Sequence, residues 1–289
     1  MHSGFATLVG RPNVGKSTLL NRILGQKVSI VSDKAQTTRN QVRGVLTRSN
    51  VQVVFVDTPG IHKPRTLLGA RLNDVAGDAA KGVDVVVFTI DATAPVGKGD
   101  RFVAGLVPGD SICVVNKIDL ASPEQVMHQL RKAGDMGFAA YHPVSATTGE
   151  GVDELLAAIV DRMPPGPRLY PDDMVTDVPE AFWIAELVRE QLLHVTKEEV
   201  PHSVACRVTE WEWPERPDRA GKTGPRIRCE ILVERDSQKG IVIGKGGNIL
   251  KAVGSAVRAQ LPDGVYLELF VKVDKDWQHR PQALQRLGY

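Results

Sequence analysis

The sequence predicts two domains of different class: an α/β domain with a mainly parallel sheet flanked by helices, followed by a smaller α+β domain. The chain has 289 residues, of which 42% are apolar, and this is enough for about two hydrophobic cores. Short apolar runs alternate with helical patterns up to about residue 162 and follow a different order beyond it. Prolines at 164, 165 and 167 separate the two patterns.

Five apolar runs in the first part are short and rich in β-branched residues, as buried parallel strands are. These runs are 5–9, 51–56, 83–90, 111–116 and 139–144. Helical patterns lie between and after them at 17–24, 67–80, 123–134 and 151–163. Strands that alternate with helices predict a doubly wound sheet. The stretch 41–47 precedes the run 51–56 across a short turn, which predicts an antiparallel hairpin at the sheet edge.

The second part predicts a different order of elements. Helices are expected at 180–197, 237–243 and 248–260, and strands at 203–213, 226–234 and 265–273. We therefore place the first domain at 1–166, a polar linker at 167–180 and the second domain at 181–289.

Overall charge and cysteine content exclude several classes of protein. The 36 Lys and Arg against 34 Asp and Glu give a net charge of +2, so the balance alone predicts neither a nucleic-acid nor an anionic-membrane partner. Three distant cysteines match no zinc spacing and indicate buried thiols in a reducing cytoplasm. The apolar runs are strand-sized, shorter than the ~20 residues of a membrane span. Residues 1–10 lack a basic stretch followed by an apolar one, so secretion is not expected.

A phosphate-binding loop is predicted at 10–17, where Gly-Arg-Pro-Asn-Val-Gly-Lys-Ser follows a strand and opens a helix. Its glycines let backbone N–H groups wrap phosphates, and the helix N-terminus adds positive potential. Lys16 is expected to reach the β and γ phosphates and Ser17 to bind magnesium. The alternative is a Gly-rich turn with no ligand.

Three further motifs follow in the order that a phosphate-loop sheet requires. Asp57-Thr58-Pro59-Gly60 ends a strand, where the carboxylate can meet magnesium through water and the Gly60 amide can meet the γ-phosphate. Asn116-Lys117-Ile118-Asp119 indicates guanine, because a buried Asp119 carboxylate accepts from N1–H and the 2-amino group together. Ser145-Ala146 is the expected backbone contact to the guanine carbonyl. Together these motifs predict a GTPase.

The polar stretch 32–40 predicts a switch loop, with Thr38 preferred over Thr37 as the threonine that binds magnesium while the γ-phosphate is present. The residue after Gly60 is Ile61, whose aliphatic side chain cannot orient the attacking water. Slow intrinsic hydrolysis is therefore expected, with the water positioned by backbone, a bound ion or a partner. The nearby polar candidates are Arg11, Asn13 and Arg39.

The second domain contains Gly244-Lys245-Gly246-Gly247 between two helical patterns, preceded by Ile243. In the KH fold a GxxG loop in this place clamps the backbone of about four nucleotides. Residues 237–262 hold three lysines and one arginine, Lys251 among them, and no acidic residue. Contact with phosphates requires a strip of positive charge beside the GxxG loop. The alternative is a tight helical turn with a solvated basic face.

Other polar and aromatic residues suggest no further chemistry. Three tryptophans could stack bases but are expected to pack: Trp211, Trp213 and Trp277. Three histidines have no partners at ligand spacing, so no metal beyond magnesium is predicted: His62, His202 and His279.

With both halves considered, the chain resembles the bacterial Era GTPases over essentially its full length. The residues that carry the resemblance are Gly10-Arg11-Pro12-Asn13-Val14-Gly15-Lys16-Ser17-Thr18, Lys34-Ala35-Gln36-Thr37-Thr38-Arg39, Asp57-Thr58-Pro59-Gly60-Ile61, Asn116-Lys117-Ile118-Asp119, Ile243-Gly244-Lys245-Gly246-Gly247 and the terminal Leu287-Gly288-Tyr289. The catalytic residues are then expected to be Lys16, Thr38 and Gly60, and the magnesium ligands Ser17, Thr38 and, through water, Asp57.

This resemblance implies a type II KH domain and a GTP- and GDP-binding, magnesium-dependent switch that binds the 3′ end region of 16S rRNA. It also implies a role in assembly of the 30S subunit and partial peripheral association with the inner membrane. We expect a cytoplasmic monomer that does not bind DNA. The insert 214–225 departs from the family pattern. Two alternatives stay open: a GTPase acting on tRNA or large-subunit RNA, and a constitutive RNA-binding module whose nucleotide stabilises the fold.

Overall fold

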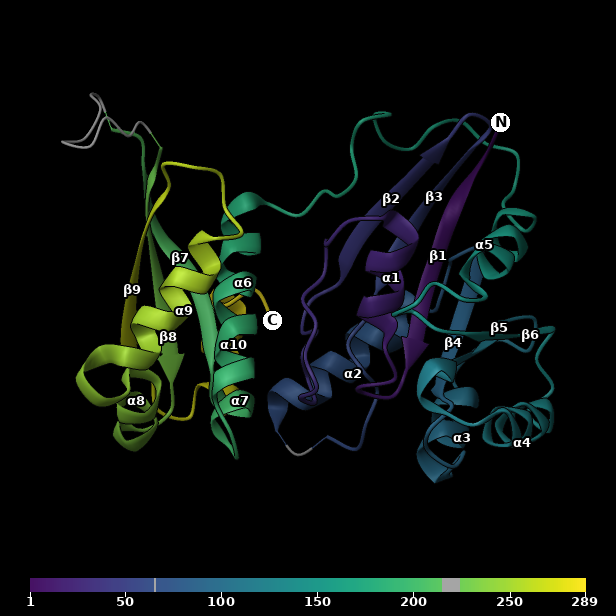
Figure 1. The fold of residues 1–289 in the computed structure, drawn as a ribbon, viewed down its shortest axis with the longest axis horizontal. Helices are drawn as coiled ribbons and strands as arrows, with labels where there is room; N and C mark the ends of the chain where they lie inside the picture. The colour runs from purple at the N-terminus through teal and green to yellow at the C-terminus, as the bar shows by residue number, and fades with distance from the viewer. Residues whose placement is uncertain (65, 215–223) are drawn as a thin grey trace. The chain divides into compact units, whose positions relative to one another are not determined.

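The computed structural model describes residues 1–64, 66–214 and 224–289, and most of the insert singled out in the sequence lies outside these residues. The chain divides into two compact units, one formed by most of Met1–Asp177 and the other by Val178–Tyr289 (Figure 1).

The first unit is built on a six-stranded sheet in the order β2-β3-β1-β4-β5-β6. The strands are β1 (His2–Gly10), β2 (Val42–Arg48), β3 (Val51–Asp57), β4 (Val85–Asp91), β5 (Ile112–Asn116) and β6 (Ala140–Val144). Every pair is parallel except β2 and β3, which form an antiparallel hairpin at one edge. The predicted doubly wound sheet and its edge hairpin are confirmed.

Helices cover both faces of this sheet. They are α1 (Lys16–Leu24), α2 (Leu67–Ala79), α3 (Lys98–Ala104), α4 (Pro123–Gly134) and α5 (Val152–Val160), with a 3-10 turn η1 at Ile118–Leu120. One apolar cluster joins α2, α3 and α4 to alternate residues of the central strands, such as Phe88 and Val115. The intervening residues, such as Val87 and Val114, are also fully buried on the opposite face.

Two predictions about these helices are wrong. The last helix ends at Val160 instead of 163, because turns lead from there to Pro164. The sequence analysis also missed α3, a seven-residue helix that buries only Asp100 and Val103. So short a segment has too few apolar positions for a helical period to be visible.

The second unit packs helices against a three-stranded sheet in the order β7-β8-β9. Its strands are β7 (Ala205–Glu212), β8 (Arg226–Val233) and β9 (Tyr266–Val273). Its helices are α6 (Glu180–Val195), α7 (Val200–Ser203), α8 (Asp236–Ile243), α9 (Asn248–Arg258) and α10 (Pro281–Arg286), with 3-10 turns η2 (Lys245–Gly247) and η3 (Trp277–His279). The pair β7–β8 is antiparallel and β8–β9 is parallel. The predicted order of elements and the KH fold are confirmed.

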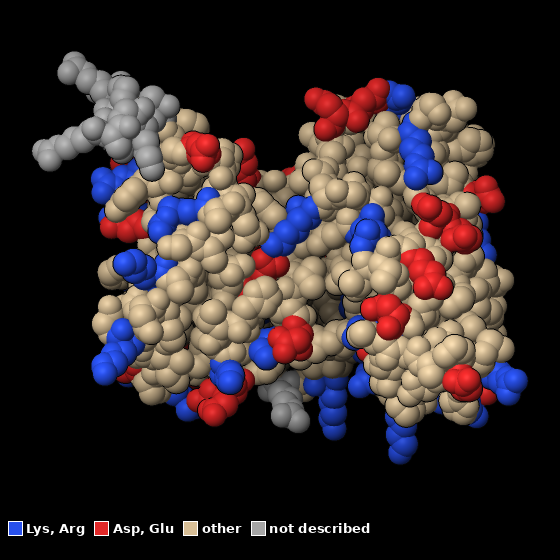
Figure 2. Space-filling view, in the orientation of Figure 1, with Lys and Arg blue, Asp and Glu red and all other residues tan. Residues whose placement is uncertain are grey.

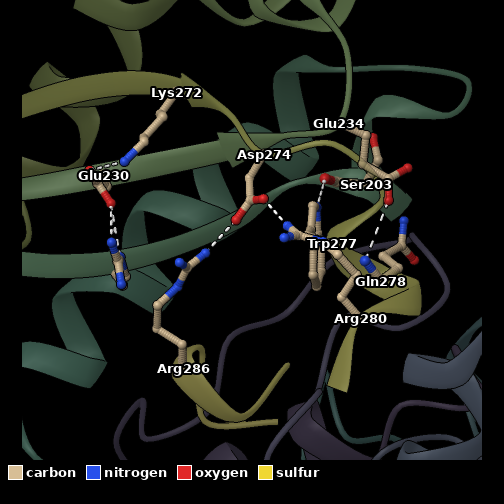
Figure 3. Close-up of polar contacts among 10 residues, drawn as sticks. Ser203, Glu230, Glu234, Lys272, Asp274, Trp277, Gln278, Arg280 and Arg286 are labelled. Carbon is tan, nitrogen blue, oxygen red and sulfur yellow. Dashed lines mark hydrogen bonds and ion pairs between the residues drawn. The ribbon is translucent and has the colours of Figure 1, made fainter. Parts of the chain in front are cut away.

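The C-terminal turns are held to α7 by Trp277, which is fully buried and lies beside Ser203 in Figure 3. Its Nε1–H donates to the Ser203 carbonyl at 2.9 Å, and Asp274 pairs with both Arg280 and Arg286. The packing role expected of Trp277 is confirmed. It is wrong for Trp213, which follows β7 and is 67% exposed. All three cysteines are buried thiols, as expected.

The segment after α5 lies against the edge of the first sheet. Gln52 is fully buried and accepts from the backbone N–H groups of Leu169 and Tyr170. Further along, the Val45 N–H donates to the Val175 carbonyl at 2.7 Å, and Thr176 forms a β-bridge with Gly44. No described helix combines the length and apolar character needed to cross a membrane.

Candidate nucleotide-binding and RNA-binding sites

The predicted phosphate loop connects β1 to α1, and its backbone conformation requires specific residues. Gly15 and Asn13 have φ values of 94° and 65°, which L side chains rarely adopt. A Cβ on Gly10 would lie 2.5 Å from the Thr89 carbonyl oxygen, and one on Gly60 would lie 2.5 Å from the Pro12 nitrogen. The glycines therefore allow the backbone of this loop to approach its neighbours closely.

Lys16 is buried inside the loop, with 6% of its surface exposed. Its Nζ donates to the carbonyls of Gly10 and Arg11 at 3.2 and 3.1 Å. Burial lowers the pKa of Lys16 to about 8, although the charge of Asp57 opposes the shift. The ammonium group is thus held largely away from water, where its attraction for an anionic ligand is strongest.

Three hydroxyl groups converge on the Asp57 carboxylate at the end of β3. Its Oδ2 accepts from Ser17 Oγ at 2.6 Å, Ser29 Oγ at 2.8 Å and Thr38 Oγ1 at 3.4 Å. Burial raises the pKa of Asp57, while the charge of Lys16 and these hydroxyl groups oppose the rise. The other oxygen, Oδ1, is buried and accepts no hydrogen bond from the described residues. Thr38, preferred over Thr37 in the sequence analysis, is the threonine in this cluster.

This cluster fits a magnesium ion. Ser17 Oγ and Thr38 Oγ1 lie 2.9 Å apart, the separation of about 2.9 Å expected of neighbouring ligands in an octahedron with bonds of about 2.0–2.1 Å. Ser17 and Thr38 would hold the ion, with Asp57 beside them. A bound magnesium would neutralise charge on the phosphates.

Ser29 and Asn21 belong to this site, and the sequence analysis missed both. Asn21 on α1 accepts from the N–H groups of Val28 and Ser29 at 2.9 and 3.0 Å and donates to the Ser29 carbonyl at 2.8 Å. Asn21 thereby fixes the loop that presents the Ser29 hydroxyl to Asp57. The only sequence signal was one polar residue within the apolar stretch 28–31.

Asn116 ties together the elements of the predicted base site. Its Nδ2 donates to the Val14 carbonyl at 2.9 Å, and its Oδ1 accepts from the Ala146 N–H at 3.0 Å. Ser145 Oγ donates to Asp119 Oδ1 at 2.7 Å. The expectation that Asp119 is buried is wrong: it lies on the exposed 3-10 turn η1 that follows Lys117.

Lys117 has a positive φ of 69° and its Nζ lies 2.6 Å from Asp91 Oδ2 at the end of β4. Partial burial acts to raise the pKa of Asp91, but hydrogen bonds from Lys117 and Thr93 hold it below its ordinary value. Asp91 therefore remains an anion that positions Lys117. This role of Asp91 was not predicted from the sequence, because an aspartate at a strand end usually belongs to a turn.

The residues around the second phosphate motif form a compact network. Ile61 is buried, and its N–H donates to the Gly10 carbonyl at 3.1 Å. Gln36 Nε2 lies 3.2 Å from His62 Nε2, and His62 Nδ1 lies 3.1 Å from the Gly60 carbonyl oxygen. Both contacts are hydrogen bonds when neutral His62 carries its proton on Nδ1. His62 thus links the switch loop to the motif at Gly60, a link the sequence did not indicate.

The remaining predicted residues occupy the same part of the first unit. Arg11 pairs with Asp100 of α3 at 3.2 Å, Arg39 is 1% exposed, and Asn13 is exposed. Thr58 is buried and donates to the Leu8 carbonyl at 2.7 Å. The other predicted nucleotide-binding residues in the loop and after Asp57 are Pro12, Val14, Thr18 and Pro59.

The GxxG tetrapeptide of the second unit forms the turn between α8 and α9. Gly244, Gly246 and Gly247 have φ values of 74°, 61° and 79°. A Cβ on Gly244 would lie 2.2 Å from Asn248 Oδ1, whereas one on Gly246 would meet nothing within 4 Å. The side chains of Lys245 and Lys251 are exposed on this turn and on α9. Ile243, which precedes the loop, is half-buried against the core.

Elsewhere in the second unit, His279 lies beside Glu234 and Asp276, with one ligand atom from each within 4.8 Å of the others. The sequence analysis found no such partners, because Glu234 comes from a distant strand end. The Glu234 carboxylate also accepts from the Gln278 N–H at 3.5 Å (Figure 3).

The fold and these sites define a P-loop GTPase with a C-terminal KH domain. The family of 50S ribosome-binding GTPases matches residues 5–117, and the KH domain family matches residues 199–278. Crystal structures of two Era proteins match the whole chain. One is Era in complex with MgGDPNP and nucleotides 1506–1542 of 16S ribosomal RNA, 40% identical, with a TM-score of 0.94 and coverage of 100% of this chain and 99% of that one. The other is a tyrosine-to-alanine variant of Aquifex aeolicus Era bound to GDP·AlF4⁻, 39% identical, with a TM-score of 0.93 and the same coverage. The chain belongs to the Era family of GTPases.

Proposed function

We propose that this protein binds and hydrolyses GTP with magnesium, binds 16S rRNA near its 3′ end and assists assembly of the 30S subunit. The observation that carries the proposal is the hydroxyl cluster on Asp57, together with full-length similarity to an Era protein whose structure contains MgGDPNP and 16S rRNA nucleotides. The cluster supports a magnesium-dependent nucleotide site, and the GxxG turn supports an RNA site.

In the first unit we propose Lys16, Thr38 and Gly60 as the residues that act on the γ-phosphate. The buried ammonium of Lys16 supplies positive charge, Thr38 joins the magnesium cluster, and the Gly60 backbone lies against the phosphate loop. Ile61 offers no hydrogen bond from its side chain, so the intrinsic hydrolysis rate is expected to be slow. Asn116, Lys117 and Asp119, with Ser145 and Ala146, are proposed to select guanine.

In the second unit we propose that RNA phosphates contact the turn 243–247 and Lys251. Figure 2 shows Lys and Arg interspersed with Asp and Glu on the visible face of the second unit. This supports positive charge confined to a strip near the turn and does not support a surface that is positive as a whole. Residues 167–289, which are the linker and the second domain together, hold 18 Lys and Arg against 19 Asp and Glu. Positive charge near GxxG is therefore a local property, and RNA binding is expected to depend on these few cations.

The test of the proposal is the affinity for a single-stranded RNA from the 3′ end of 16S rRNA, measured with GDP and with a non-hydrolysable GTP analogue at one salt concentration. A difference between the two nucleotide states is expected, because Thr38 joins the magnesium cluster through the switch loop. Equal affinity would instead support a constitutive RNA-binding module, and no binding in either state would support another RNA target.

We further propose a monomeric, cytoplasmic protein that associates with the inner membrane only peripherally. The basis of this proposal is what the resemblance carried by the sequence motifs implies. Cell fractionation tests it: protein in the membrane fraction should be released by high salt, and protein released only by detergent would contradict the proposal.

A further inference from the structure

The second unit contains a pocket of about 400 Å³ at some distance from the GxxG turn. The turn lies at the N-terminus of α9, whereas the pocket is lined by Gln260 and Leu261, which follow the C-terminus of that helix. An 11-residue helix spans ~16 Å. The pocket is therefore separate from the proposed phosphate contacts, and its volume lies in the range of about 300–1,000 Å³ usual for ligand sites.

Aromatic rings form much of the pocket, since three of the four tryptophans in the chain line it. Trp183 on α6 and Trp211 on β7 are half-buried and pack against the core. Trp213 is 67% exposed, although tryptophan usually buries most of its large ring. Three indole side chains therefore line one pocket.

The charged residues in the described lining of the pocket are both acidic. Glu180, at the start of α6, and Asp263, before β9, both line it and are exposed. Neither carboxylate forms an ion pair or hydrogen bond within the described parts of the chain. None of the described residues that line the pocket is Lys or Arg.

Two described arginines close to the lining residues in the chain, Arg226 and Arg258, have other partners. Arg226 lies over the Tyr266 ring at 5.2 Å, and Arg258 donates to Ser255 Oγ at 3.1 Å. Among the described residues, the two carboxylates of the pocket therefore have no cation from these side chains.

We propose that this pocket binds an arginine side chain presented by a basic polypeptide segment of a partner. A guanidinium group can stack on an indole ring and donate two parallel hydrogen bonds to a carboxylate, so it uses both features of the pocket at once. RNA is a poorer occupant, because its phosphates would lie next to Glu180 and Asp263. The second unit would then carry an RNA-binding turn and, apart from it, a protein-binding pocket.

The test is titration of the full-length protein with acetyl-Arg-Arg-Arg-amide, followed by intrinsic tryptophan fluorescence. A saturable change is expected, weakened by added salt, and acetyl-Lys-Lys-Lys-amide should bind more weakly because an ammonium group cannot stack or pair bidentately. Trp213→Ala and Asp263→Asn should each weaken binding roughly tenfold. Trp213→Phe should restore most of the affinity.

Asp110→Asn, which removes an exposed carboxylate from the first unit, is the matched control and should bind like the wild type. Since Trp213 is largely exposed, its replacement is not expected to unfold the domain, and circular dichroism checks this. The proposal is overturned if no saturable change occurs up to millimolar peptide, or if both pocket variants bind as the control does. Competition by single-stranded RNA that is lost in Trp213→Ala would also overturn it, because the pocket would then take a base.

Discussion

Replacing Ser29 by alanine tests whether the magnesium cluster is built as described. Ser29 is 1% exposed and Asp57 is fully buried, so the variant removes a hydroxyl donor from a carboxylate that is not exposed to bulk solvent. A hydrogen bond to a charged group contributes about 1.5–3 kcal/mol, and loss of a group that supports a metal ligand typically costs about 10–100-fold in metal affinity. We therefore expect Ser29→Ala to weaken magnesium binding by about 30-fold.

The assay is the release rate of a fluorescent GDP analogue, measured with magnesium and with EDTA. Magnesium should slow release strongly in the wild type, and the ratio of the two rates should fall by about 30-fold in Ser29→Ala while the rate in EDTA stays unchanged. Asn21→Ala should act in the same direction but less, because it loosens the loop and keeps the hydroxyl. Ser255→Ala, an exposed serine on α9, is the control. Equal acceleration with and without magnesium would refute the reasoning, since it would mean general damage to the nucleotide site.

Three further variants test the phosphate loop, the predicted guanine site and the GxxG turn. Lys16→Met should stabilise the nucleotide-free protein at pH 7 by up to about 3 kcal/mol in urea unfolding. In the wild type the pKa of Lys16 is lower in the folded than in the unfolded chain, so the stability gained by the variant should shrink as pH rises from about 8 toward 10.5. A difference in unfolding free energy that does not change with pH would contradict the idea that burying the charged ammonium group destabilises the fold. Asp119→Asn should shift preference from guanine to xanthine nucleotides in competition binding, because an amide can donate where the carboxylate accepts, and retained guanine selectivity would refute its role. Gly246→Asp should weaken RNA binding about tenfold at matched salt; the φ of 61° at this residue adds strain, so Gly246→Asn is the uncharged control.

Much of the first unit could be predicted because its signals are local. The apolar runs, the edge hairpin and the motifs at strand ends depend on residues close together in the chain, and the parallel sheet brings those ends together. Ser29, Asn21 and Asp91 could not be predicted, because their roles come from contacts across the fold. The exposure of Asp119 could not be predicted from the sequence either, since it depends on the turn η1 that places this residue at the surface.

The elements of the second unit could be predicted for the same reason, and the prediction that failed there again depended on contacts across the fold. The order of its elements and the GxxG turn depend on local patterns, and the structure has them in that order. A tryptophan near the end of an apolar strand is expected to be buried, yet β7 ends at Glu212, one residue before Trp213. Whether a side chain at a strand end meets the core depends on where pairing stops, and that is decided by the partner strand.

The contacts between the edge of the first sheet and residues 169–177 shorten the tether between the domains. Arg43 on β2 pairs with Asp177 at 3.2 Å and its carbonyl accepts from Thr176, so the chain is anchored almost until α6 begins at Glu180. Only residues 178 and 179 lie between the last anchored residue and the helix. The three Cα steps from residue 177 to residue 180 span at most about 11 Å. The anchoring strand also begins directly after the switch loop. A rearrangement of that loop could therefore release contacts that anchor the linker. Each contact released would lengthen the free linker, and this would change the distance that the second domain can reach and its effective concentration near the first domain.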